Sequence, residues 1–246
     1  MCPILFRGTP FQMDAYVLMT TLGFVAMGLL AHRRARQLQL DPRRVFRVFV
    51  CAAASGFVGA RIGYVILHWE QYRPNPLMIL RVLDGGMVWY TGLFLGTCGA
   101  IWAIRRVGLP LWKMLDLLAA PTAMMRVFGR SGCFLSGCCR GIPSALPWAV
   151  PFPPEGVPRH PTQLYESGGI LAIFLILKGL ERHGHPEGIL PGVGFTLYAL
   201  VRFELEWVRA DAIPGPGGLS IGQWFSLALL AVGLWIVRNR LRVSHA

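Results

Sequence analysis

The sequence predicts an all-α polytopic membrane protein with seven transmembrane helices, because it combines an apolar composition with long uncharged runs. Hydrophobic residues make up 54% of the 246-residue chain and charged residues only 15%, whereas soluble domains carry about 25% charged residues. The runs 85–104 and 218–237 contain no charged residue at all. At 1.5 Å per residue, each run covers about 30 Å, the thickness of the hydrocarbon core of a bilayer. A lipid bilayer is therefore an expected partner.

Each expected helix is an apolar segment that ends at a basic or proline-rich connection. In the first segment the arginines follow the apolar run, so we expect a retained helix rather than a cleaved signal. No internal repeat or second domain is evident, so residues 1–246 are expected to form one transmembrane domain with a short Pro-rich external loop at about 140–161. In chain order the expected helices are 13–31, 45–69, 85–104, 111–130, 162–178, 188–209 and 218–238.

The basic residues predict the orientation of these helices. With the N-terminus outside, the connections on the cytoplasmic side carry fourteen Lys and Arg residues and the outer connections carry six. Lys and Arg gather on the cytoplasmic side of membrane proteins, so we expect an N-terminus outside and a cytoplasmic C-terminus. The net charge of +12 is thereby explained by topology. Nucleic acid is not an expected partner, because no basic face with interleaved aromatic residues is present.

Several charged residues fall inside or at the rim of the expected spans. A charge at the bilayer centre costs about 2.5–3.5 kcal/mol, so such residues usually face a polar interior and serve a function. The expected topology places six of them toward the outer leaflet: Arg61, Arg126, Arg130, Glu166, Arg202 and Glu206. Tyr198, Arg202, Glu206 and Arg209 also follow a spacing of i, i+4, i+8 and i+11, which forms one stripe of a helix.

The balance of these charges predicts an anion site. The arginines outnumber the two aligned glutamates, and the planar fork of arginine suits phosphate. An anion held in the outer leaflet indicates a phospholipid headgroup. Buried ion pairs that hold the helix bundle together are the structural alternative, and an anion transporter is a functional one. A transporter would place its charges at the midplane, between repeats with broken helices.

A series of ordered motifs resembles the prolipoprotein diacylglyceryl transferase family. The motifs are "GARIGYV", "LDGGMVWYTGLFLG", "GRSGCFLSGCCRG", "PWAVPFP", "RHPTQLYES", "LYALVRFELEWVR" and "LSIGQW". The resemblance implies an enzyme of the bacterial cytoplasmic (inner) membrane, with its active site toward the outer leaflet. Such an enzyme moves the diacylglyceryl group of phosphatidylglycerol to the lipobox cysteine in the signal peptide of a preprolipoprotein. A thioether forms and glycerol 1-phosphate leaves, with no metal and no organic cofactor.

The resemblance also implies roles for particular residues. Arg130 and Arg202 are expected to bind the phosphate, Glu206 to orient Arg202, and Arg209 to draw in the headgroup. His160 is expected to anchor the Pro-rich loop. The other expected substrate-binding residues are Tyr16, Arg61, Arg126, Gly141, Gln163, Glu166 and Tyr198.

Tyr90 marks a departure from the family pattern, because many members carry a histidine at this position. Histidine titrates near 6.5 and can act as a base at neutral pH, whereas tyrosine, near 10, is a poor base unless it is perturbed. Three interpretations stay open. The base is dispensable because the arginines ionise the thiol, Tyr90 is a perturbed catalytic phenolate, or the chain is a lipid-binding paralogue without catalysis.

Cys133, Cys138 and Cys139 form a compact cluster in "GRSGCFLSGCCRG". A metal site is disfavoured, because a zinc or iron–sulfur site needs a second pair of cysteines or a Cys/His set. A disulfide between Cys133 and one of the other two is an open alternative near the oxidising face. A tight glycine-rich turn is the favoured interpretation.

Overall fold

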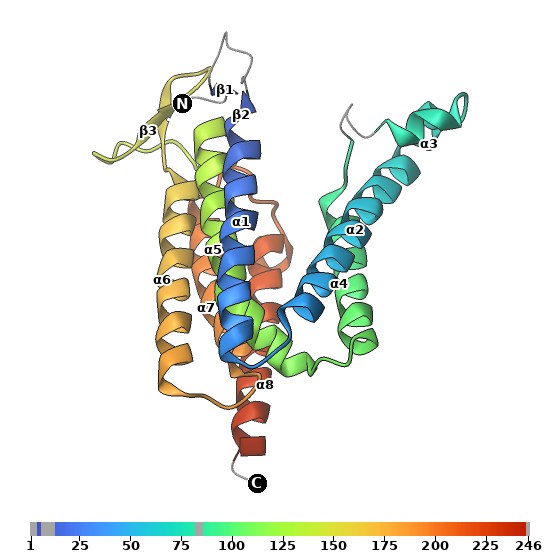
Figure 1. The fold of residues 1–246 in the computed structure, drawn as a ribbon. Coiled ribbons are helices and arrows are strands. Elements are labelled where there is room, and N and C mark those ends of the chain that lie inside the picture. The colour runs from blue at the N-terminus through green and yellow to red at the C-terminus, as the bar shows by residue number, and fades with distance from the viewer. Residues whose placement is uncertain (1–3, 6–12, 82–85, 245–246) are drawn as a thin grey trace. The chain divides into compact units, whose positions relative to one another are not determined.

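The computed structural model describes residues 4–5, 13–81 and 86–244, and within them the chain is almost entirely helical (Figure 1). The long helices are α1 (Ala15–Gln37), α2 (Pro42–Leu67), α4 (Trp89–Arg106), α5 (Leu111–Ser136), α6 (Thr162–His183), α7 (Ile189–Leu205) and α8 (Ile221–Ser244). The short helical elements are α3 (Trp69–Tyr72), η1 (Pro76–Leu80), η3 (Glu206–Val208) and η4 (Pro216–Gly218). Two antiparallel pairs of short strands complete the fold: β1 (Ile4–Leu5) with β2 (Met13–Asp14), and β3 (Val150–Phe152) with β4 (Val157–Arg159).

The apolar helices confirm the prediction of an all-α membrane protein. Four of the described helices are long and apolar enough to cross a bilayer by length and composition, namely α1, α2, α6 and α8. Each expected segment coincides with one long helix, with differences at the ends. The count of seven spans and the orientation of the termini stay predictions.

Two helix ends differ from the expectation in ways that concern the site. The helix expected to end at 130 continues to Ser136, so the start of the expected glycine-rich turn, including Cys133, is helical. The helix expected at 188–209 ends at Leu205, and Glu206 begins a separate 3₁₀ turn. The prediction of a single helical stripe from Tyr198 to Arg209 is therefore wrong at its outer end.

The chain divides into two compact units, and the boundaries fall within α1 and α5. One unit comprises 34–114, and the other comprises 1–33 and 115–246. Within the first unit, α2 and α4 pack along each other as an antiparallel pair (Figure 1). The backbone N–H of Val88, just before α4, donates to the carbonyl of Ala60 on α2 at 2.9 Å.

In the second unit, α5, α6 and α7 share an apolar core, and α8 packs along α7. The core side chains include Ala120 of α5 and Leu177 of α6, which are fully buried. Asp116 of α5 caps the start of α7, because its carboxylate accepts the backbone N–H groups of Gly188 and Leu190. Helix N-termini leave such donors without intrahelical partners, so this buried carboxylate fixes α7 against α5.

Candidate functional site

Glu166 is the centre of the charged cluster. Its side chain is 1% exposed and faces three guanidinium groups. Oε1 lies 3.3 Å from Nη2 of Arg126 and 3.0 Å from Nε of Arg130, and Oε2 lies 3.9 Å from Nη1 of Arg209. Even with Asp211 beside Arg209, the cluster holds more cations than carboxylates, and it keeps a positive charge that can bind an anion.

Local structure explains why these groups meet. Arg126 and Arg130 stand one turn apart on α5, so their side chains share a face. Glu166 lies in the second turn of α6, which begins at Thr162. Arg209 reaches the same carboxylate from the extended segment after η3, where Asp211 holds its guanidinium through bonds of 2.9 and 2.6 Å.

Tyr198 of α7 connects Arg126 to Glu166 through its hydroxyl group. Its hydroxyl donates to Oε1 of Glu166 at 3.1 Å and accepts a hydrogen bond from Arg126. The guanidinium carbon of Arg126 lies 4.4 Å from the centre of the Tyr198 ring, a cation–π contact. Arg126 is thus held by two partners, which favours a positioning role for it.

Arg202 and Glu206 form a second pair at the end of α7. Nη1 of Arg202 lies 2.8 Å from Oε2 of Glu206, but neither atom has a hydrogen-bond partner among the described residues. The contact is therefore electrostatic and leaves a donor of Arg202 available for an anion. Gly222 of α8 lies against Glu206, because a Cβ built there would be 2.3 Å from Oε1. Gly222 is the glycine of the motif "LSIGQW", and the motif by itself does not indicate that this glycine makes room for the Glu206 carboxylate.

The turn after α5 is bound to the start of α6. Thr162 Oγ1 donates to the carbonyl of Cys139 at 2.8 Å, and Gln163 Nε2 donates to the carbonyl of Cys138. Both side chains are 1% exposed. Gln163 stands about one helical turn before Glu166 on α6, so its bond to Cys138 fixes the segment after α5 close to Glu166. This contact supports a role for Gln163 in positioning the site.

Gly141 and His160 connect this turn to the segment that carries Arg209. The N–H of Gly141 donates to the carbonyl of His160 at 3.0 Å, and Gly141 forms an antiparallel bridge with Arg209. The ring Nδ1 of His160 lies 3.3 Å from the hydroxyl of Tyr165. Trp148 donates to that hydroxyl at 2.8 Å, so His160 sits in an aromatic hydrogen-bonded group, as expected of a loop anchor.

The Pro-rich loop carries an ion-pair group of its own. Glu155 Oε2 accepts from Arg159 at 2.8 Å, and Oε1 accepts from Arg140 at 3.0 Å. The hydrogen bond from Arg159, together with the charge of Arg140, lowers the pKa of the Glu155 carboxyl below its ordinary value. The pair Glu155–Arg159 also closes the β3–β4 hairpin, because Arg159 ends β4.

Cys133, Cys138 and Cys139 bring their Sγ atoms within 4.8 Å of one another, the one group of metal-ligating side chains found among the described residues. A hydrogen bond from Cys133 and the nearby charge of Arg130 lower the pKa of the Cys139 thiol to about 5. The thiols of these three residues are free in this structure. They are the residues that could hold a metal.

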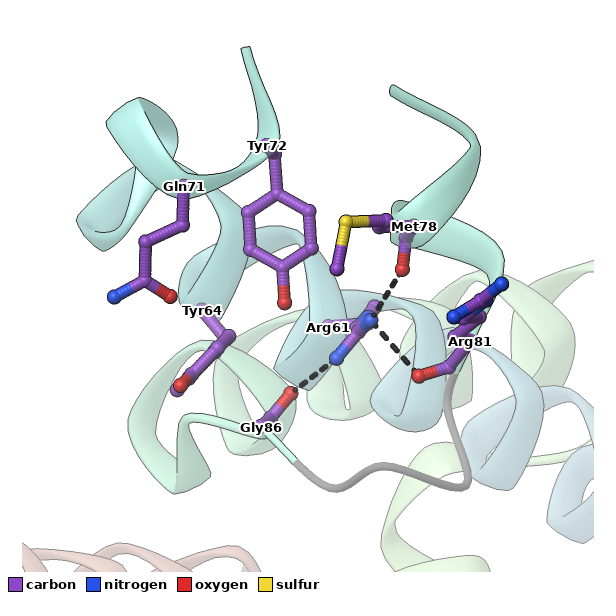
Figure 2. Close-up of a pocket in the computed structure, with 7 residues that line it drawn as sticks. All are labelled: Arg61, Tyr64, Gln71, Tyr72, Met78, Arg81 and Gly86. Carbon is purple, nitrogen blue, oxygen red and sulfur yellow. Dashed lines mark hydrogen bonds between the residues drawn. The ribbon is translucent and has the colours of Figure 1, made fainter. Parts of the chain in front are cut away.

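Arg61 lies in the unit formed by 34–114, where its guanidinium binds backbone (Figure 2). Nε donates to Ile79 at 3.0 Å and Nη1 to Gly86 at 3.1 Å, while Nη2 donates to Met78 at 3.0 Å and to Arg81 at 3.1 Å. Its plane also lies over the Tyr72 ring, 5.4 Å from the centre. These contacts favour a structural role, and its substrate-binding role stays a prediction.

Tyr90 and Tyr16 are the two expected site tyrosines that lie outside α5, α6 and α7. Tyr90 is 78% exposed in the first turn of α4, in the unit formed by 34–114. Tyr16 is 45% exposed at the start of α1, next to Gly132 of α5. The structure thus gathers Arg126, Arg130, Glu166, Tyr198 and Arg209 in one cluster, with Arg202 and Glu206 as a pair on α7 and η3.

The fold and this cluster define a helical membrane protein with a buried glutamate surrounded by arginines. Comparison with known proteins gives the family: residues 3–238 match the model of the prolipoprotein diacylglyceryl transferases, and the chain belongs to this family. The resemblance of the sequence motifs is thereby confirmed.

Individual relatives agree with the family model. A phosphatidylglycerol–prolipoprotein diacylglyceryl transferase of Nitratidesulfovibrio vulgaris is 35% identical over 246 residues, which cover 94% of this chain and 91% of the relative. A protein of the same name from Clostridium tetani is 30% identical over 243 residues, with 96% of each chain covered. Another from Allorhizobium ampelinum is 35% identical over 262 residues, which cover 99% of this chain and 91% of the relative.

Proposed function

We propose that this chain transfers the diacylglyceryl group of phosphatidylglycerol to the lipobox cysteine of a preprolipoprotein and releases glycerol 1-phosphate. The observation that carries the proposal is the buried carboxylate of Glu166, which faces three arginines. Arg202 stands one helical turn along α7 from Tyr198, whose hydroxyl binds Glu166. The family match and the names of the relatives favour this transferase over an anion transporter and over a non-catalytic paralogue.

The reaction needs a bound phosphate and an ionised thiol. The sulfur attacks the glycerol carbon that carries the phosphoester oxygen. The C–O bond breaks, its electron pair stays with the phosphate, and the thiol proton passes to solvent or a base. Arg130 and Arg202 bind the departing phosphate, since fixed cations stabilise the charge that develops on a leaving group. Glu166 and Glu206 position these two arginines, and Arg209 attracts the headgroup.

The attacking thiol belongs to the substrate. A free cysteine has a pKa near 8.5, and neighbouring cations lower it. The excess of arginines over carboxylates in the cluster therefore increases the thiolate fraction at neutral pH. On this basis a base at Tyr90 is dispensable.

We further propose a seven-span protein of the bacterial cytoplasmic (inner) membrane, with the N-terminus outside and the site toward the outer leaflet. The excess of Lys and Arg in the expected cytoplasmic connections supports this orientation. Protease added to intact spheroplasts should remove an epitope tag from the N-terminus and spare a tag at the C-terminus. The reverse pattern would contradict the orientation.

Transfer is tested with the purified full-length chain, phosphatidylglycerol and a lipobox peptide, with the thioether product detected by mass spectrometry. The wild type should form product, and Arg202→Ala should lower the rate by about 100-fold or more, as loss of a charge-stabilising donor does. Arg73→Ala, an exposed arginine in the C-cap of α3, is the matched control and should keep the wild-type rate. Lipid binding without product in the wild type would refute the transferase, and a fully active Arg202→Ala would refute the phosphate site.

A further inference from the structure

The end of α5 has a backbone geometry that brings cysteine side chains together. Gly137 adopts a left-handed conformation with φ 74°, and its N–H donates to the carbonyl of Phe134 at 3.1 Å. The N–H of Cys138 donates to the carbonyl of Cys133 at 3.2 Å. These two bonds form a Schellman motif, in which the side chains at the positions of Cys133 and Cys138 come into contact.

Cys139 completes the group through an unusual backbone conformation. Its φ of 56° lies in the left-handed region, which residues with a Cβ rarely adopt, and such strain gathers at functional sites. Thr162 holds its carbonyl at 2.8 Å, and Gln163 holds the carbonyl of Cys138. The turn therefore directs three Sγ atoms toward one point, within 4.8 Å of one another.

The surroundings suit a cation held by thiolates. Arg130 and Arg209 lie near Cys139, so two cations adjoin a site that becomes negative when three thiolates bind one ion. Cys133 is buried, Cys139 is half-buried and Cys138 is exposed, which leaves a route from solvent to the group. Three sulfurs that bind one zinc-sized ion at about 2.3 Å lie about 4 Å apart in a trigonal arrangement, so small rotations of the side chains suffice.

The sequence pattern disfavours a metal because it offers three cysteines, but the three Sγ atoms lie within 4.8 Å of one another. We propose that Cys133, Cys138 and Cys139 form a binding site for one soft, thiophilic metal ion such as Zn(II) or Cu(I). The three sulfurs bind as thiolates, and the thiol protons pass to solvent when the ion enters. The described residues supply three ligands, so a water molecule completes the tetrahedron for Zn(II), and Cu(I) is bound in a trigonal plane. The site adjoins Arg130 of the proposed transfer reaction but supplies no group to that reaction.

Cadmium is the probe for the test, because Cd–thiolate bonds give an ultraviolet charge-transfer band. Full-length protein is purified in detergent, reduced, freed of metal and titrated with Cd(II). We expect a band that saturates at one equivalent. Cys133→Ser, Cys138→Ser and Cys139→Ser should each weaken binding by about 100-fold or more. Cys51→Ser and Cys98→Ser, in the unit formed by 34–114, are matched controls and should keep the band.

Alkylation of the wild-type protein provides a second measurement. It does not depend on whether the cysteine variants fold. Bound Cd(II) should protect Cys133, Cys138 and Cys139 from a maleimide while Cys98 stays reactive, as read by peptide mass spectrometry. No saturable band, or a band unchanged in the three variants, would overturn the proposal. A disulfide within the group that persists after reduction and prevents binding would overturn it as well. All these readouts are independent of transferase activity, so this proposal and the proposed function can fail separately.

Discussion

Replacement of Glu166 by glutamine tests the central interpretation of the site. Glu166→Gln keeps the size and shape of the side chain but removes the one carboxylate that faces Arg126, Arg130 and Arg209. Among the described residues, Arg126 and Arg130 then keep no carboxylate within 4.0 Å, while Arg209 keeps its pair with Asp211. Breaking a buried ion pair in this way costs about 3–5 kcal/mol of unfolding free energy.

The stability assay is reversible unfolding in mixed detergent micelles, followed by circular dichroism. The matched control is Glu155→Gln, which also removes a carboxylate shared by two arginines but lies on the exposed surface. Exposed ion pairs contribute little, because water screens them. Glu166→Gln should therefore be clearly less stable than Glu155→Gln. Equal stability of the two variants would show that the cluster is not electrostatically coupled.

Three further predictions concern other parts of the chain. Tyr90→Phe should keep transfer within about two-fold of the wild-type rate, because the arginines ionise the thiol, and a large loss of rate would restore the phenolate mechanism. Gly222→Ala should displace the Glu206 carboxylate, which a new Cβ would approach to 2.3 Å, and should lower the transfer rate. The control Gly168→Ala has nothing within 4 Å and should keep the rate, and equal rates for both variants would contradict this contact. Because the pKa of Glu155 is lowered in the folded state, its ion pairs hold the loop above the ordinary carboxyl pKa of about 4.3 and release it as pH falls through the lowered pKa. The protection factors of the β3–β4 hairpin amides against hydrogen exchange should thus fall in acid, and a Glu155→Gln variant with the same pH profile would exclude this cause.

The sequence predicted the helices well because long apolar runs have few structural alternatives. It also predicted that charges from several helices serve one site, and Arg126, Arg130, Glu166 and Arg209 do meet. The expected topology gives only the depth of each charged residue in the bilayer, so it does not show which arginine pairs with which glutamate. The dependence of three arginines on Glu166 follows from side-chain packing between α5, α6 and the segment after η3.

The end of α7 shows why the remaining details were missed. Periodicity extended the helix to Arg209, but contacts distant in sequence end it sooner. Ile142 donates to the carbonyl of Val208 at 2.9 Å, and Ala210 donates to the carbonyl of Arg140 at 3.3 Å. These bonds bind the segment to the Pro-rich loop instead of continuing the helix. No local signal in the sequence of α7 reveals such partners, because they lie about seventy residues earlier.

Arg61 carries a consequence for how the protein enters the membrane. Among the described residues, its guanidinium donates to the carbonyl groups of Met78, Ile79, Arg81 and Gly86, on the connection between α2 and α4. Backbone carbonyl groups close in sequence thus take the place of water around the Arg61 guanidinium, within the hairpin formed by α2 and α4. Charged residues in a span usually depend on distant helices for partners. Here we expect the α2–α4 hairpin to shield its charge as soon as its own residues are synthesised, before the ribosome has made α6 or α7.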